Sequence, residues 1–116
     1  MRLLAAERVC AEGVDVLAVK GEIDVASSGR LITALNDVVT NGEQAVVVDL
    51  SEVGFMDSTG LALLLNALRR VTKRGHGFAV VCPEGPVRRV FEVTDMLDTL
   101  KVHHTRAAAL HAAAAV

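Results

Sequence analysis

The stretch that decides the fold of this chain is residues 45–75, which read AVVVDLSEVGFMDSTGLALLLNALRRVTKRG. Residues 45–48 are consecutive apolar residues, mostly β-branched, and they predict a strand buried on both faces. From Leu61 onwards apolar residues recur at helical spacing, and basic residues fill the other side and the last turn. This pattern predicts a helix over residues 58–74 that ends at Gly75. Strand gives way to helix at residues 56–60, where we expect any functional site to lie.

The flanking segments predict strands that alternate with helices. We expect an opening hairpin with strands at residues 3–10 and 14–20, after which residues 21–24 leave the sheet. Further strands are expected at residues 78–82 and 100–102. Helix signals are an amphipathic run from about Ala26, a stop at Asn41-Gly42, Pro86 at a first helical position, and Thr105 as a cap. The sequence therefore predicts an α/β fold with a mixed sheet, antiparallel in its first hairpin and largely parallel elsewhere, packed with about four helices.

Length and composition limit the classes of function. At 116 residues the chain is expected to form a single domain, residues 1–116. A formal charge of −2 and only three aromatic residues, all Phe, argue against a direct nucleic-acid partner. No apolar run approaches the ~20 residues needed to span a membrane, and the first residues are too short for a secretory signal. We therefore expect a cytoplasmic protein with no membrane partner.

The cysteines and histidines do not form a ligand pattern. Cys10 and Cys82 lack a metal-binding spacing, and we expect two reduced, buried thiols at strand ends, with any redox role open. The histidines are expected to face solvent: His76, His103, His104 and His111. No metal site, catalytic residue or cofactor is predicted.

Ser58 has two compatible interpretations. Any residue of Asp57-Ser58-Thr59 can cap the helix by accepting a hydrogen bond from an orphan backbone N–H. An exposed Ser58 hydroxyl at a helix N-terminus could also carry a phosphoryl group, which would meet free N–H donors and add close to two negative charges. A hydrolase nucleophile is disfavoured because the G-x-S-x-G pattern is absent and no motif ties a histidine to Ser58.

Leu63 breaks the pattern of this helix. It lies opposite the apolar stripe and one turn from Ser58, with Ala62 and Ala67 giving a shallow surface nearby. A single exposed leucine is common on protein surfaces. Next to Ser58, however, it indicates a face that binds a partner protein.

The chain resembles a known family in several segments. Residues 46–50 (VVVDL) and 55–61 (FMDSTGL) resemble the STAS domain of bacterial anti-sigma factor antagonists, and residues 21–25 (GEIDV) match that family's first strand-to-helix loop. The element order and the helix around residues 87–91 agree as well. The resemblance therefore covers essentially the whole chain and implies the STAS fold.

This resemblance implies a partner-switching function. An anti-sigma factor with serine kinase activity would bind the face formed by Asp24, Asp57, Ser58, Thr59 and Leu63, which frees a sigma factor. The kinase would then phosphorylate Ser58 from ATP, the complex would fall apart, and a PP2C-type phosphatase would reset the switch. Asp24 and Asp57 match family positions that help kinase recognition.

Two points stay open in the resemblance. Many relatives have Gly after the Thr that ends the third helix, whereas Asp95 follows Thr94 here, so that loop is expected to differ. The same fold also serves stressosome-like scaffolds and transport-accessory modules, which work by constitutive assembly. A serine in this loop does not exclude them.

Overall fold

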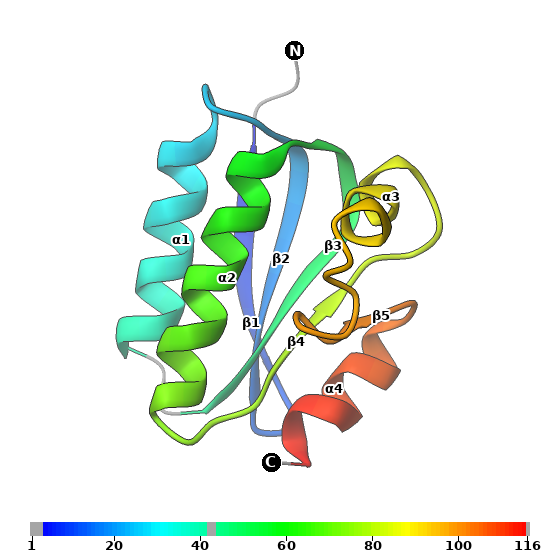
Figure 1. The fold of residues 1–116 in the computed structure, drawn as a ribbon. Coiled ribbons are helices and arrows are strands. Elements are labelled where there is room, and N and C mark those ends of the chain that lie inside the picture. The colour runs from blue at the N-terminus through cyan, green and yellow to red at the C-terminus, as the bar shows by residue number, and fades with distance from the viewer. Residues whose placement is uncertain (1–3, 42–43, 116) are drawn as a thin grey trace.

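The computed structural model describes residues 4–41 and 44–115, which form one sheet and four helices in these ranges (Figure 1). The elements in chain order are β1 Ala5–Ala11, β2 Val14–Ile23, α1 Ser28–Asn41, β3 Ala45–Met56, α2 Ser58–Lys73, β4 Phe78–Val81, α3 Pro86–Val93, β5 Val102–His103 and α4 Arg106–Ala114. The predicted order of strands and helices is confirmed. The predicted stop at Asn41-Gly42 lies partly outside the described residues, since Gly42 falls in the gap and Asn41 ends α1.

The sheet is mixed, as predicted, and its strands follow the order β1-β2-β3-β4-β5. β1 pairs antiparallel with β2, and the other neighbours pair parallel. Helices α1, α2 and α3 cover one face of the sheet, while α4 covers the other (Figure 1). The middle of the sheet is therefore buried on both faces, which is why β4 (FAVV) and residues 45–48 of β3 (AVVV) are apolar runs.

Two strands are longer than predicted. β2 continues through Gly21 to Ile23, and β3 continues past Asp49 to Met56, because residues 21–23 pair with residues 53–56. The expectation that residues 21–24 leave the sheet is therefore wrong for residues 21–23. The signal was hidden because exposed polar residues such as Glu52 interrupt the apolar run, and the pairing passes through irregular register shifts.

The predicted signals at helix ends are confirmed. Gly75 has φ 82°, and the amides of Gly75 and His76 donate to the carbonyl oxygens of Thr72 and Val71, which closes α2 with a left-handed cap. Pro86 is the first residue of α3, and the Thr105 side chain accepts from the Ala108 amide at the start of α4.

Helix α3 is followed by a residue with positive φ, and its buried face includes a charged side chain. Asp95 adopts φ 59°, the left-handed conformation that a glycine would take, so the backbone turns there despite the side chain. Arg88 is buried and its Nη1 donates to the Cys82 carbonyl oxygen at 2.7 Å. β5 also begins at Val102, not at Leu100, since residues 97–100 form a turn.

Helix α4 is held to the sheet by an ion pair and by a close backbone contact. Arg106 Nε donates to Asp49 Oδ2 at 2.9 Å, Nη2 lies 2.9 Å from the same oxygen, and Asp49 is buried. Gly77, just before β4, lies so close to α4 that a Cβ atom there would overlap the Ala113 carbonyl oxygen. A side chain at Gly77 would therefore push α4 off the sheet.

We predict that Gly77→Ala lowers the free energy of unfolding by roughly 1–3 kcal/mol, because the added methyl group overpacks a backbone contact. Gly29→Ala in α1 is the matched control, since a Cβ atom there would meet no atom within 4 Å. That control should leave stability unchanged or raise it by up to ~1 kcal/mol. Urea denaturation would measure both, and equal midpoints for the two variants would contradict the close contact.

Candidate functional site

The site predicted at residues 56–60 lies where β2 and β3 end together. Ile23 and Met56 are the last paired residues of these parallel strands, and the Asp57 amide donates to the Ile23 carbonyl oxygen at 3.2 Å. Since parallel strands end at the same edge of a sheet, Asp24 and Asp57 follow neighbouring strand ends. The structure thus brings together two acidic residues that are far apart in the sequence.

Asp57 is the residue that caps α2. Its backbone is extended, with φ −105° and ψ −170°, and its Oδ1 accepts from the Thr59 amide at 2.9 Å. Ser58 is consequently free of the capping role and occupies the first position of the helix. It is exposed, and within residues 4–41 and 44–115 its hydroxyl has no hydrogen-bond partner.

Asp24 shapes the turn that leads into α1. Its Oδ1 accepts from the Ser27 amide at 2.9 Å, and its own amide donates to Ser27 Oγ at 3.0 Å. The Ser27 hydroxyl also donates to the Glu22 carbonyl oxygen at 2.7 Å. This reciprocal arrangement resembles a capping box and fixes the loop beside Asp57.

Gly60 brings the first turn of α2 directly onto the strand ends. A Cβ atom at this position would lie 2.5 Å from Met56 Cγ and 2.7 Å from Ile23 Cγ2. Both of these atoms belong to buried side chains, so neither can move away easily. The glycine of the DSTG motif is therefore required for packing, a role that the sequence pattern did not indicate.

Thr59 and Leu63 lie on the flank of α2 that faces α1. Both are half-buried, and Leu63 packs against the main hydrophobic core. Arg70, two turns beyond Leu63 on the same flank, donates from Nη1 to Asn36 Oδ1 of α1 at 2.6 Å. The expectation that Leu63 points away from the core is therefore wrong, because α1 covers the side of α2 that seemed free.

The small residues near Leu63 also differ from the prediction. Ala62 is exposed as expected, but Ala67 is 1% exposed and belongs to the core. Small residues on α2, with Gly60 at its start, permit close packing, so the buried stripe is rotated towards them. A helical wheel places the buried face at the large apolar residues, so it does not detect this rotation towards small ones.

Two exposed apolar residues flank the site and were not predicted. Val25, in the loop after β2, is 74% exposed, and Phe55, near the end of β3, is 48% exposed. Both lie close to a site residue along the chain: Val25 directly follows Asp24, and Phe55 is two residues before Asp57. The sequence did contain one signal for an exposed apolar residue here. Phe55 is one of only three aromatic residues in the chain, and it follows Gly54.

The charge at this edge is negative. Asp24 and Asp57 are half-buried, and in the described part of the chain neither carboxylate has an ion-pair partner. A phosphoryl group on Ser58 would add negative charge beside them. The arrangement therefore suits a surface whose affinity for a partner changes with the charge of one hydroxyl.

The two cysteines differ in their exposure. Within the described residues no cluster of three or more His, Cys, Asp or Glu could hold a metal ion. Cys82 is buried, as expected, and burial raises the pKa of its thiol to about 11, so the thiol stays protonated near neutral pH. Cys10 is exposed, which corrects the expectation that both thiols are buried, because β1 is an outer strand.

The histidines only partly match the expectation that all of them face solvent. His104 and His111 are exposed, whereas His76 and His103 are half-buried. His104 Nε2 lies 2.9 Å from Glu84 Oε1, and this hydrogen bond lowers the pKa of Glu84. These contacts stabilise the start of α3 and do not involve Ser58.

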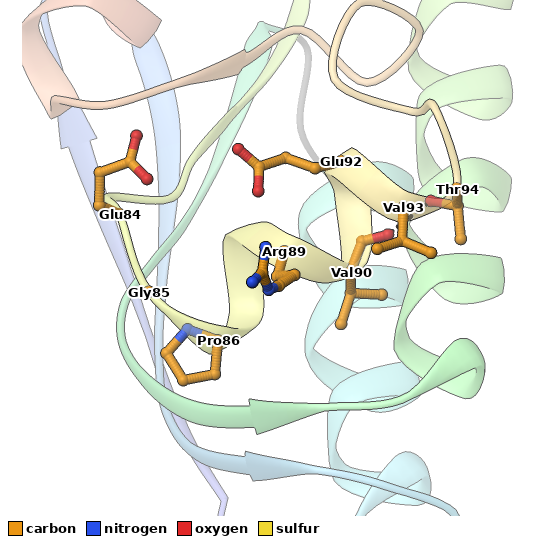
Figure 2. A pocket seen from close by; sticks show the side chains of 8 residues that line it. All are labelled: Glu84, Gly85, Pro86, Arg89, Val90, Glu92, Val93 and Thr94. Carbon is orange, nitrogen blue, oxygen red and sulfur yellow. Dashed lines mark hydrogen bonds between the residues drawn. The ribbon is translucent and has the colours of Figure 1, made fainter.

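A surface hollow of about 670 Å³ runs along α3 (Figure 2). Its lining comes from α3 and the residues beside it: Glu84, Gly85, Pro86, Arg89, Val90, Glu92, Val93 and Thr94. The side chains drawn in Figure 2 do not converge on a common point, so the hollow offers no preformed catalytic arrangement. It is distinct from the edge that carries Ser58.

The sequence matches a known protein family over most of its length. The family model described as STAS domain matches residues 5–109, which is most of the chain. The chain belongs to the STAS domain family. No helix of this STAS domain, in the parts that the structure describes, is long and apolar enough to cross a membrane.

Several relatives of this STAS domain are named as anti-sigma factor antagonists. The anti-sigma-F factor antagonist RsfB of Mycobacterium tuberculosis (strain H37Rv) is 33% identical over 93 residues, covering 80% of this chain and 75% of that protein. The anti-sigma-B factor antagonist of Staphylococcus aureus (strain NCTC 8325) is 29% identical, covering 73% and 79%. A crystal structure of an anti-sigma factor antagonist from Mycobacterium paratuberculosis has a TM-score of 0.88 at 33% identity, covering 95% and 93%.

We predict that Asp57→Ala lowers the stability of this STAS domain by about 1 kcal/mol, because the Thr59 amide loses its acceptor. Asp57→Asn keeps an acceptor oxygen and should retain most of the stability. Thermal unfolding followed by circular dichroism would measure the difference. If the two variants were equally destabilised, the stabilising effect of Asp57 would come from its negative charge and not from the hydrogen bond that caps α2.

Proposed function

We propose that this STAS domain is an anti-sigma factor antagonist that is switched off by phosphorylation of Ser58. In this proposal residues 1–116 act as one domain in the cytoplasm and bind an anti-sigma factor with serine kinase activity, which releases a sigma factor. The observation that carries the proposal is the exposed Ser58 hydroxyl at the start of α2, beside two carboxylates and without a hydrogen-bond partner among the described residues. Its relatives named as anti-sigma factor antagonists support the same assignment.

The chemistry of the switch would belong to the partner. The kinase would transfer the γ-phosphoryl group of ATP to Ser58 Oγ, with ADP as the leaving group and the hydroxyl proton lost to the kinase or solvent. The chain itself would contribute no catalytic residue. A PP2C-type phosphatase would hydrolyse the phosphate ester and restore the hydroxyl.

The phosphate would weaken binding mainly through charge. It would lie at the N-terminus of α2, where the helix dipole and free N–H groups tolerate an anion, so the fold would survive. In the complex, however, the same phosphate and the carboxylates of Asp24 and Asp57 would have to lose water together. Burying like charges without cations to pair them is costly, so the complex would dissociate.

The docking surface would combine polar and apolar residues at this edge. Asp24, Asp57 and Thr59 would surround Ser58, and Leu63 would contribute only the part of its side chain that α1 leaves open. The apolar contact would come mainly from Val25 and Phe55, the exposed residues on either side of the site. Exposed apolar residues that flank a functional group are typical of protein interfaces.

Phosphorylation can be tested with purified kinase-type anti-sigma factors, chosen from those encoded near this gene, and ATP. Intact-mass spectrometry should detect one added phosphate on the native chain and none on Ser58→Ala. Ser28→Ala is the matched control, because Ser28 is the first residue of α1 as Ser58 is of α2, and it should still be modified. A phosphate that persists in Ser58→Ala would refute the proposal, and Ser58→Asp should bind the partner at least about tenfold more weakly.

The apolar part of the surface can be tested separately. We predict that Phe55→Ser weakens binding of the anti-sigma factor at least about tenfold while the chain stays folded, because an exposed aromatic residue is a typical interface anchor. Val9→Ser is the control: Val9 is 38% exposed but pairs with Val16 on a different part of the sheet. Isothermal titration calorimetry would compare them, and equal affinities would place the interface elsewhere.

A further inference from the structure

The outer strand β1 has an open edge. Within the described residues it pairs with β2 alone; it carries two charged residues, Glu7 and Arg8, but no Pro, and its register with β2 is unbroken over seven residues. All its residues except Ala11 are exposed. Natural sheets usually protect such an edge with charges, bulges or prolines, because unpaired N–H and C=O groups can bind another strand. At the other edge of the sheet β5 has only two residues.

The hairpin turn determines which backbone groups are unpaired. Glu12 and Gly13 both have positive φ, 54° and 77°, and they connect the paired residues Ala11 and Val14 as a two-residue turn. The pair that closes such a turn is hydrogen-bonded, and bonded pairs then alternate along the ladder. Consequently the N–H and C=O groups of Ala6, Arg8 and Cys10 point away from β2.

These groups have no partner in the described residues, since no backbone hydrogen bond outside the β1–β2 ladder reaches them. We propose that β1 pairs antiparallel with β1 of a second copy of this chain, around a twofold axis at Arg8. This register places Arg8 opposite Arg8 and Ala6 opposite Cys10. Every outward N–H of one copy then meets an outward C=O of the other, and the two sheets become continuous.

The charges at the axis do not oppose a second copy. In each copy Arg8 Nη2 lies 3.2 Å from Asp15 Oδ2, and Arg8 Nη1 lies 3.6 Å from Asp37 Oδ2. Two arginines facing one another would repel if they were alone. Here each arginine is already paired with two carboxylates of its own copy, so the arginines are compensated. A second copy is the occupant because the twofold register matches β1 to itself, with Ala6 opposite Cys10 and the outward N–H groups opposite outward C=O groups.

The side chains along β1 leave room for this approach. On one side of the sheet Ala6 and Cys10 are opposite one another, and on the other side Ala5 meets Ala11 while Glu7 meets Val9. These pairs are small or mixed and include no like charges. Strand pairing of this kind buries a small area, so the dimer is weak and its population depends on concentration.

Sedimentation equilibrium of the full chain would test the dimer and its edge. The native chain should dimerise reversibly in the micromolar to millimolar range. Ala6→Pro removes an outward N–H and spares the β1–β2 ladder, so it should weaken dimerisation about tenfold or more without lowering the melting temperature. Ala6→Ser keeps the N–H and should dimerise like the native chain. A native chain that stays monomeric at millimolar concentration, or an Ala6→Pro variant that dimerises normally, would overturn the proposal.

Disulfide trapping would test the register. In the proposed dimer the Cα atoms of residues 6 and 10 from opposite copies lie about 5.5 Å apart, within range of a disulfide bond. Under mild oxidation Ala6→Cys should therefore give a covalent dimer with a 6–10 link, identified by peptide mapping. The two native Cys10 residues would be about 13 Å apart along the strands and should not link.

Ala5→Cys is the matched control, because its side chain points to the opposite side of the sheet and cannot reach Cys10. It should give no 5–10 link under the same conditions. Equal trapping in Ala5→Cys and Ala6→Cys, or rapid Cys10–Cys10 linkage in the native chain, would overturn the register. Loss of the 6–10 link when Cys10→Ser is added would support it.

Discussion

The parallel pairing of β2 with β3 is the constraint on which the rest of this structure depends. β3 is the longest strand, lies in the middle of the sheet and contributes valines to both faces. A slip of one residue would exchange its two faces, moving Val46 and Val48 under α4 and Val47 under α1 and α2. The pairing also ends at Ile23 and Met56, so the same register that builds the core places Asp24 beside Asp57.

The second face of the sheet is held by fewer contacts and by more specific ones. Helix α4 is mostly alanine, and within the described residues only Ala109 and Ala113 of this helix are buried. Asp49 is therefore important, because its carboxylate is buried in the sheet and would be costly without Arg106 and Ser51, which bind it. The absence of a side chain at Gly77 lets the short alanine side chains reach the valines beneath them.

Local signals predicted most of the fold and part of the site. A cap among residues 57–59, the turn at Gly75 and Pro86 at the start of α3 depend on neighbours in the sequence, so they could be inferred directly, although the choice of Asp57 as the cap could not. The length of β3, the half-buried Leu63 and the buried Arg88 depend on what packs against them, which the sequence does not state. Val25 and Phe55 were missed for the same reason: an apolar residue is assigned to the core until its surroundings are known.

The close packing at Gly60 has a kinetic consequence. Ile23 and Met56 lie beneath it and Asp57 caps the helix, so close packing and a hydrogen bond restrain the turn that displays Ser58 before anything binds. A partner that docks on it meets a rigid patch, so association is limited by orientation and not by ordering of a loop, typically at about 10⁵–10⁷ M⁻¹s⁻¹. A change in the charge of this patch would then be seen mainly in how long each complex lasts.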